Sequence, residues 1–205
     1  MEWIGTIAFA VSGALIAVSN SLDLFGVIFL GCITAVGGGI LRDILLEQCP
    51  PAIFSNTPVL LVAAITSVAV FIIAYLNRQH FNTLKDKIER INNLFDAVGL
   101  AAFSVIGTEI ACTAGFSNKI LFSVIMGMIT GVGGGMFRDV FVASSPYILK
   151  KHIYALASLF GSILYYIIRE YAENTVLGTI AAMLSVVLIR MLATKYRWKL
   201  PKLNI

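Results

Sequence analysis

Charged side chains are scarce in this sequence. Of its 205 residues only 13% are Asp, Glu, Lys or Arg, while 59% are hydrophobic and the mean hydropathy is +0.90. Soluble domains carry about 25% charged and about 45–50% apolar residues. The composition therefore excludes an ordinary soluble domain, and with it an enzyme whose active site lies in an aqueous lobe. We expect a protein embedded in the lipid bilayer.

Cysteine is rare as well, and its placement excludes two common kinds of site. Cys32, Cys49 and Cys112 form neither a C-x-x-C pair nor a metal-ligand spacing with histidine. An odd number of cysteines without such motifs argues against a zinc site and against a disulfide framework. We expect no metal and no other cofactor. The net charge of +4 does not indicate nucleic acid, because the basic residues flank apolar runs and so report orientation in a membrane.

What the chain does have is a series of apolar runs long enough for membrane helices, which need about 20 residues each. The first begins at Trp3, without the basic region or cleavage site of a signal peptide, so we expect it to be a permanent span. These runs predict an all-α membrane protein with seven transmembrane helices. The expected spans are Ile4–Ser19, Leu24–Leu46, Pro58–Leu76, Leu94–Ala111, Ile120–Val142, Ile153–Ile168 and Thr175–Leu192.

The two halves of the chain resemble each other on either side of one polar linker, Asn77–Asn93. At an offset of 94, seven residues between Gly5 and Ala17 recur between Gly99 and Ala111, and at an offset of 96 TAVGGGILRD returns as TGVGGGMFRD. Internal repeats of this kind are typical of transport proteins. We therefore expect a first three-helix repeat over residues 1–76, a linker over 77–93, a second repeat over 94–169, and a seventh helix with a basic tail over 170–205.

Basic residues predict the orientation of the chain, because cytoplasmic loops are enriched in Lys and Arg. The side shared with the C-terminus holds ten of them, against two on the other side, Lys119 and Arg169. The ten are Arg78, Lys85, Lys87, Arg90, Lys150, Lys151, Lys195, Arg197, Lys199 and Lys202. We expect the N-terminus outside and the C-terminus in the cytoplasm, in the inner membrane. Since each repeat has three spans, the second is inverted relative to the first.

Each repeat carries three consecutive glycines inside a long span. Such a triplet costs about 1 kcal/mol per residue relative to alanine and favours a kink or an unwound turn, whose freed backbone groups must face protein or a water-filled path. We expect these kinks to line a pathway. The alternative is close helix packing, since the glycines also follow small-xxx-small spacing. The glycines are Gly37, Gly38, Gly39, Gly133, Gly134 and Gly135.

An Arg-Asp pair follows each glycine triplet, as Arg42 with Asp43 and Arg138 with Asp139. Charges inside a bilayer are functional candidates by default, because they are costly unless they face protein or water. The alternative is that each arginine extends to the interface and is structural. Glu109 is a further intramembrane carboxylate, able to pair with an arginine or to coordinate an ion. We interpret Asp96 and Glu2, which start their spans, as cap or interface residues.

The doubled motif TAVGGGILRD and TGVGGGMFRD, the inverted arrangement and the extra seventh span together resemble prokaryotic members of the trimeric intracellular cation channel family, over nearly the whole chain. The resemblance implies a homotrimer in which each protomer has a pore for monovalent cations, potassium or sodium, bounded by the kinked second and fifth helices. It implies pore residues at the glycine triplets, Arg42, Asp43, Arg138 and Asp139. Related bacterial proteins are also described as glycine transporters.

Three functions remain open from the sequence. A potassium-permeable channel needs a continuous wet path, whereas a carrier for a small zwitterion such as glycine needs a cavity that opens to one side at a time. Inverted repeats serve either. A structural scaffold held by small-xxx-small faces is the third, and it leaves the intramembrane arginines without a purpose. We favour the channel.

Overall fold

The computed structural model describes residues 1–78, 85–146 and 153–198. Within them seven helices are long and apolar enough to span a membrane. The elements are α1 (Glu2–Ser19), α2 (Leu24–Leu45), the short η1 (Ala52–Phe54), α3 (Thr57–Leu76), α5 (Lys85–Ala111), the π-helical turn η2 (Cys112–Phe116), α6 (Ile120–Phe141), α8 (Ile153–Tyr171) and α9 (Thr175–Lys195). This all-helical arrangement confirms the predicted fold class.

Local chemistry explains where several helices begin and end. The Asp23 carboxylate accepts a hydrogen bond from the Gly26 amide at 2.8 Å, and the Asn174 side chain caps α9 in the same way through Leu177 at 2.9 Å. Gly115 has φ of 96°, a left-handed conformation that glycine tolerates, and it interrupts η2 between α5 and α6. Capping side chains and one glycine turn therefore determine where these helices begin and end.

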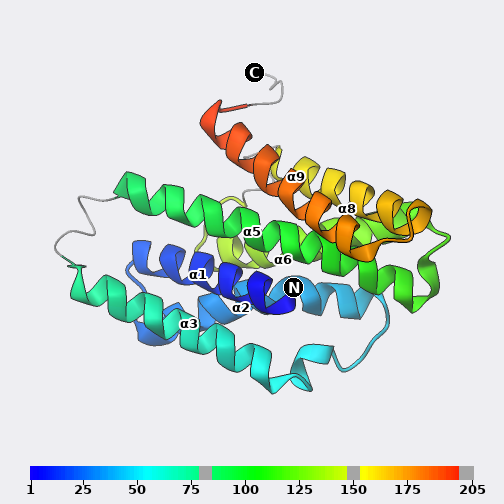
Figure 1. Ribbon diagram of the computed structural model, residues 1–205. Helices are drawn as coiled ribbons and strands as arrows, with labels where there is room; N and C mark the ends of the chain where they lie inside the picture. Colours follow the sequence, from blue (N-terminus) through cyan, green and yellow to red (C-terminus); the bar gives the residue numbers. More distant parts are fainter. Residues whose placement is uncertain (79–84, 147–152, 199–205) are drawn as a thin grey trace, which may run out of the picture.

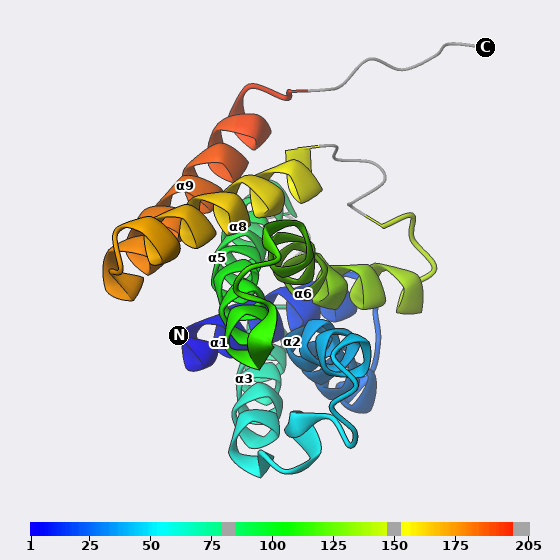
Figure 2. The ribbon, with the colours of Figure 1, turned by 90° about the vertical axis from the view of Figure 1, so that its right-hand side faces the viewer.

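Four helices form the centre of the molecule: α1 and α2 pack on each other, as do α5 and α6, and the two pairs meet through α1 with α5 and α2 with α6. Figure 2 looks along the bundle and shows α3 on one side of this centre and α8 with α9 on the other. Phe9 and Phe103, which are equivalent under the offset of 94, stack between the halves with ring centroids 5.4 Å apart. Two residues that correspond in the sequence repeat therefore face each other at the centre of the molecule.

The two ends of the bundle are distinguished by the chain termini. The end at which α1 begins, with Glu2, is called the N-terminal end, and the end at which α9 finishes, with Lys195, is called the C-terminal end (Figure 1). Arg42 lies in the last turn of α2, at the N-terminal end, and Arg138 in the last turn of α6, at the C-terminal end. The two Arg-Asp pairs therefore lie toward opposite ends of the bundle.

Neither glycine triplet forms an unwound turn, one of the two forms expected above; a kink, the other form, stays a prediction. Both α2 and α6 are helical without interruption through Gly37–Gly39 and Gly133–Gly135. The glycines serve close approach instead: a Cβ atom added to Gly133 would lie 2.9 Å from the Cα atom of Gly38. Because the helical pattern continues through both triplets, their backbone carbonyls are not freed, and the absence of side chains lets the two helices approach closely.

The linker between the repeats is shorter than predicted, because α5 begins at Lys85 rather than at Leu94. Residues Lys85–Asn93 are mostly polar, and their helical turns precede the apolar run of α5. Residues 79–84 of the linker lie outside the described part of the chain, as do Lys150, Lys151, Lys199 and Lys202, on which the orientation partly rests.

Candidate functional site

Arg138 is the centre of a buried polar network at the crossing of α6 with α1 and α5. Its side chain is fully buried, and Nη1 donates to Ser12 Oγ at 2.6 Å and to Asp96 Oδ1 at 2.8 Å. Its Nε donates to Asp139 Oδ1 at 2.9 Å, while the Ser12 hydroxyl donates to Asn92 Oδ1 at 2.8 Å. A charge so deep in an apolar bundle is stabilised only by such paired hydrogen bonds.

The last two helices complete this network. From α8, the Tyr154 hydroxyl donates to Asp96 Oδ1 at 3.3 Å. From α9, Arg190 places Nη2 3.7 Å from Asp96 Oδ2 and its guanidinium carbon 4.7 Å from the centroid of the Tyr154 ring. We call this set the Arg138 cluster; it consists of Ser12, Asn92, Asp96, Arg138, Asp139, Tyr154 and Arg190. The cluster contains two arginines and two aspartates, so these charges sum to zero.

The first Arg-Asp pair has a different setting. Arg42 donates from Nε to Asp43 Oδ1 at 2.8 Å and holds the same oxygen with Nη2 at 2.7 Å. The other carboxylate oxygen of Asp43 accepts from the backbone amide of Ala52 at 2.9 Å, which ties η1 to the end of α2. This pair therefore anchors a loop and at the same time fixes where the Arg42 guanidinium lies.

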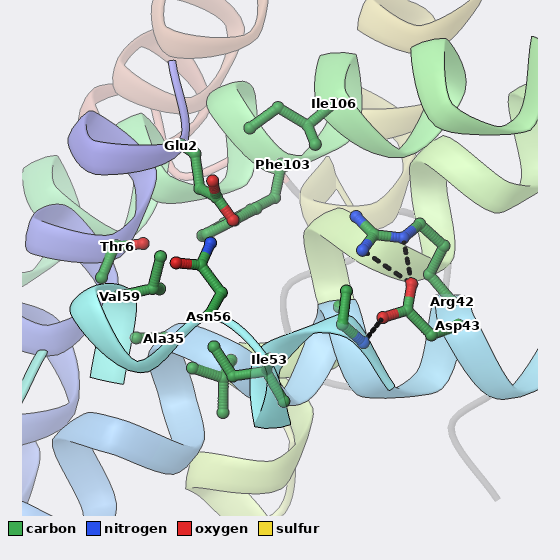
Figure 3. A pocket seen from close by; sticks show the side chains of 13 residues that line it. Glu2, Thr6, Ala35, Arg42, Asp43, Ile53, Asn56, Val59, Phe103 and Ile106 are labelled. Atoms are coloured by element: carbon green, nitrogen blue, oxygen red, sulfur yellow. Dashed lines mark hydrogen bonds and ion pairs between the residues drawn. The ribbon is translucent and has the colours of Figure 1, made fainter. Parts of the chain in front are cut away.

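Arg42 borders a cavity of about 50 Å³ at the N-terminal end of the bundle. That volume is enough for a few water molecules. Figure 3 shows Arg42 and Asp43 on one side of it and Glu2 with Asn56 on the other. The lining residues are Glu2, Thr6, Ala35, Val36, Gly39, Arg42, Asp43, Ala52, Ile53, Asn56, Val59, Phe103 and Ile106. They come from α1, α2, η1, α3 and α5, together with the residue that precedes α3.

One polar atom in the cavity wall has no partner in the described part of the chain. The Thr6 hydroxyl is buried, and no hydrogen-bond partner lies within reach of it among these residues. Buried polar groups are nearly always hydrogen-bonded, often to water or to a ligand. Together with Glu2, Arg42 and Asp43, this hydroxyl places polar groups on the wall of a cavity that is otherwise lined by apolar residues.

The two ends of the bundle are equivalent in sequence and different in structure. Arg42 and Arg138 correspond at an offset of 96, and Glu2 and Asp96 correspond at an offset of 94. At the C-terminal end Arg138 and Asp96 form an ion pair at 2.8 Å, whereas at the N-terminal end Arg42 and Glu2, both in the described chain, line the cavity and form no ion pair with each other. Equivalent residues therefore line a cavity at the N-terminal end and form an ion pair at the C-terminal end.

Glu109 lies apart from both places. Its Oε2 accepts from Arg169 Nε at 2.6 Å and from the Tyr165 hydroxyl at 2.7 Å, and Arg169 also lies 3.5 Å from Glu170. Glu109 therefore pairs with an arginine, one of the two roles expected above, and its place in an ion pathway stays a prediction. It borders neither the cavity nor the Arg138 cluster, and about a third of its side chain is exposed.

Sequence reasoning missed most of the partners of the arginines. Asp96, interpreted above as a cap or interface residue, is fully buried and binds two arginines, because α5 begins 11 residues earlier and carries it into the bundle. Arg190 stands alone in the last apolar run, and a charge in such a run is the signal that identifies it. Ser12, Asn92 and Tyr154 carry no comparable signal, since they are ordinary residues whose partners depend on helix crossings.

Comparisons with known proteins agree with this architecture. The family model described as "Glycine transporter" matches residues 1–75 and 93–170. The UPF0126 inner membrane protein YadS of Escherichia coli strain K12 is 39% identical, over 98% of this chain and 93% of its own. The crystal structure of a prokaryotic TRIC channel in 0.5 M KCl superposes with a TM-score of 0.84 at 36% identity, covering 97% and 96% of the chains. The TRIC orthologue from Rhodobacter sphaeroides gives a TM-score of 0.85 at 29% identity, covering 96% of each.

Proposed function

Because this chain belongs to the family of the prokaryotic TRIC channels and the UPF0126 membrane proteins, we propose that it is a homotrimeric channel for monovalent cations, with potassium as the main permeant ion and one pathway in each protomer. Its role is then transport across the bacterial inner membrane and not catalysis. The observation that carries the proposal is the difference between the two ends of the repeat: a polar cavity at Arg42 and a sealed polar cluster at Arg138.

The proposed pathway runs between the two halves of the molecule. It enters at the cavity, passes the crossing of α2 and α6 at the glycine triplets, and leaves through the Arg138 cluster. Its residues are Gly37, Gly38, Gly39, Arg42, Asp43, Gly133, Gly134, Gly135, Arg138 and Asp139, joined by Glu2, Thr6 and Asp96. Polar groups from α1, α2, α5 and α6 follow one another along the proposed pathway. An interface that served helix packing alone would not require them.

Charge in the cavity favours a cation despite the arginine. Arg42 is neutralised by Asp43, which it holds at 2.7 Å, and Glu2 then leaves one negative charge on the cavity wall. A charged wall in a narrow cleft concentrates ions of opposite sign. Arg42 acts as a fixed positive group that keeps Asp43 in place, and Glu2 supplies the field that attracts potassium.

A carrier for a small zwitterion such as glycine is the second candidate. It is favoured by the coexistence of a guanidinium and a carboxylate, Arg42 and Glu2, on opposite sides of one cavity. A zwitterion would place its carboxylate at the arginine and its ammonium group at the glutamate. The family description as a glycine transporter is consistent with this reading.

Purified protein in planar bilayers under a potassium gradient separates the two candidates. The channel predicts unitary currents that reverse near the potassium equilibrium potential, and thallium flux into liposomes that does not depend on glycine. Saturable uptake of labelled glycine without unitary currents would reject the channel in favour of the carrier. For the assembly, the mass in detergent should be three times the protomer mass of 22.2 kDa; a single protomer mass would reject the trimer.

We further propose that Glu2 lies on the outer side of the inner membrane and the C-terminus in the cytoplasm. The support is the excess of lysine and arginine at the C-terminal end of the bundle, including Arg78, Lys85 and Lys195. A green fluorescent protein fused to the C-terminus should fluoresce in cells, and an alkaline phosphatase fused there should be inactive. The reverse pattern would overturn the orientation.

A further inference from the structure

Arg190 is the one arginine of the Arg138 cluster that comes from outside the repeated helices. It lies on α9, which has no counterpart in the first repeat and packs mainly against α5 and α8 among the described elements. The side chain is 3% exposed, although most of α9 faces outward. A helix on the edge of the bundle therefore sends a charge into its centre.

Arg190 interacts with Asp96 through its charge and not through hydrogen bonds. Its Nε and Nη2 have no hydrogen-bond partner in the described part of the chain, and neither has Asp96 Oδ2, the atom that Nη2 faces at 3.7 Å. Arginine in a fixed structural pair is normally bidentate, with two short bonds to the carboxylate. Here the attraction is that of charge and of the Tyr154 ring face, 4.7 Å away. Such contacts hold a cation near a carboxylate without binding it tightly.

Asp96 divides its two oxygens between two cations. Oδ1 is held by Arg138 at 2.8 Å, with the Tyr154 hydroxyl at 3.3 Å, and this half of the carboxylate is satisfied. Oδ2 has Arg190 as its ion-pair partner among the described residues. Removing Arg190 takes one positive charge away and leaves half of a fully buried carboxylate without a counter-ion, which is costly at this depth.

We infer that Arg190 is a tethered cation that occupies, at Asp96 Oδ2, the place a permeating potassium ion takes when the C-terminal end of the pathway opens. This inference rests on the proposed channel function and deepens it. On opening, α9 moves outward and separates the Arg190 guanidinium from Asp96. The permeating ion then replaces the guanidinium as the partner of Asp96. Asn92 lies one helical turn before Asp96 on α5, and its buried Nδ2 also lacks a partner in the described chain, so it is a donor available to a water molecule that accompanies the ion.

The test compares the wild type with Arg190→Gln, which keeps a polar side chain and removes the charge. Two quantities are measured on detergent-purified protein and on liposomes: the melting temperature in KCl against N-methyl-D-glucamine chloride at equal ionic strength, and thallium flux. For Arg190→Gln we expect a melting temperature that is higher in KCl than in the bulky salt, and a flux about tenfold above wild type, since one positive charge about 4 Å away disfavours a cation by more than that factor at an effective dielectric constant near 20. The wild type should show no preference between the salts.

Two matched controls separate this role from structure. Arg190→Lys keeps the tethered charge and should behave as the wild type. Arg169→Gln removes another arginine that pairs with a carboxylate, at 2.6 Å, and lies outside the cavity and the cluster; it should show neither salt preference nor increased flux. Equal loss of melting temperature in both salts for Arg190→Gln, with unchanged or reduced flux, would overturn the inference and make Arg190 a structural residue.

A second variant serves if Arg190→Gln does not fold in either salt. Asp96→Asn combined with Arg190→Gln removes the tethered cation and its carboxylate together, and the amide that replaces the carboxylate still offers an oxygen to Arg138. This double variant should exceed the wild-type flux and show no preference for KCl; flux at or below wild type would overturn the inference. Failure of the channel proposal looks different, because the wild type and all variants would then carry no thallium.

Discussion

Gly38 in α2 lies directly against the carbonyl oxygen of Thr130 in α6, and Gly134 lies against the carbonyl oxygen of Thr34 in the same manner. A Cβ atom on either glycine would overlap the facing oxygen. The four residues are equivalent in pairs under the offset of 96. The crossing of α2 and α6 is therefore symmetric, and its distance is set by two positions that admit no side chain.

Gly38→Ala should destabilise the protein, because the new methyl group meets backbone that has no room to yield. Overpacking of this kind costs about 1–3 kcal/mol, more than the gain in helix propensity of about 1 kcal/mol. Gly39→Ala is the matched control, since its Cβ would lie 3.7 Å from Arg42 Nη2, an ordinary van der Waals contact. A lower melting temperature for the first and an equal or higher one for the second checks this. Equal losses would refute close packing as the reason for the triplet.

Glu2→Gln should reduce potassium conductance severalfold at low ionic strength and less in concentrated salt. Asp43 and Arg42 neutralise each other, so the carboxylate of Glu2 is the unbalanced charge on the cavity wall. The substitution removes that charge, whose effect on ions is screened by salt. Glu47→Gln is the control, since Glu47 lies just past the end of α2, at the same end of the bundle, and does not line the cavity. Conductance measured over a range of KCl concentrations decides the matter. A Glu2→Gln channel that conducts normally in dilute salt would remove Glu2 from the pathway.

Two carboxylates that both pair with arginine should respond very differently to neutralisation. Asp43→Asn removes the negative charge that neutralises the buried Arg42, and its single carbonyl oxygen is unable to accept from both Arg42 and the Ala52 amide, so we expect a loss of about 3–5 kcal/mol. Glu109→Gln breaks a pair that is 20% and 34% exposed, for which about 0–1 kcal/mol is typical. Thermal unfolding in detergent of both variants gives the comparison. Similar small losses would mean that Asp43 does not anchor the loop after α2.

The arrangement of helices was predictable because it rests on signals that a sequence carries directly. Apolar runs fix the number of spans, and the recurrence of Arg42 with Asp43 as Arg138 with Asp139 fixes which turns correspond. The predicted ends of α2, α3 and α6 lie within a residue of those observed. The start of α5 was not predicted correctly, because the prediction followed the apolar run. Residues Lys85–Asn93 are mostly polar, yet they extend the same helix.

The contents of the site were predictable only in part. The intramembrane arginines are recognisable because a charge in an apolar run is costly, whereas their partners depend on which helices cross and at what depth. Asp96 reads as a helix-start residue in sequence, yet the earlier start of α5 buries it against Arg138. The glycine triplet was interpreted as a break because sequence records the cost of glycine in a helix and not the neighbouring Thr130 backbone that requires it.

Ser12→Ala should loosen the closed end of the pathway. The Ser12 hydroxyl accepts from Arg138 at 2.6 Å and donates to Asn92 at 2.8 Å, so it ties α1 to α6 and to α5 through one oxygen. Its removal leaves the Asn92 carbonyl oxygen unsatisfied in a buried site, which costs about 1–3 kcal/mol. Because this loss falls on the closed arrangement alone, we expect a lower melting temperature together with a higher thallium flux.

The control for Ser12→Ala is Ser185→Ala, which removes a hydroxyl that bonds within its own helix, to the Ala182 carbonyl at 2.8 Å. It should change neither quantity by much. If Ser12→Ala lowers the melting temperature and lowers the flux as well, the tie between α1 and α6 supports the conducting arrangement instead. The cluster around Arg138 would then be part of the open pathway, and the closed end would have to be sought elsewhere along α6.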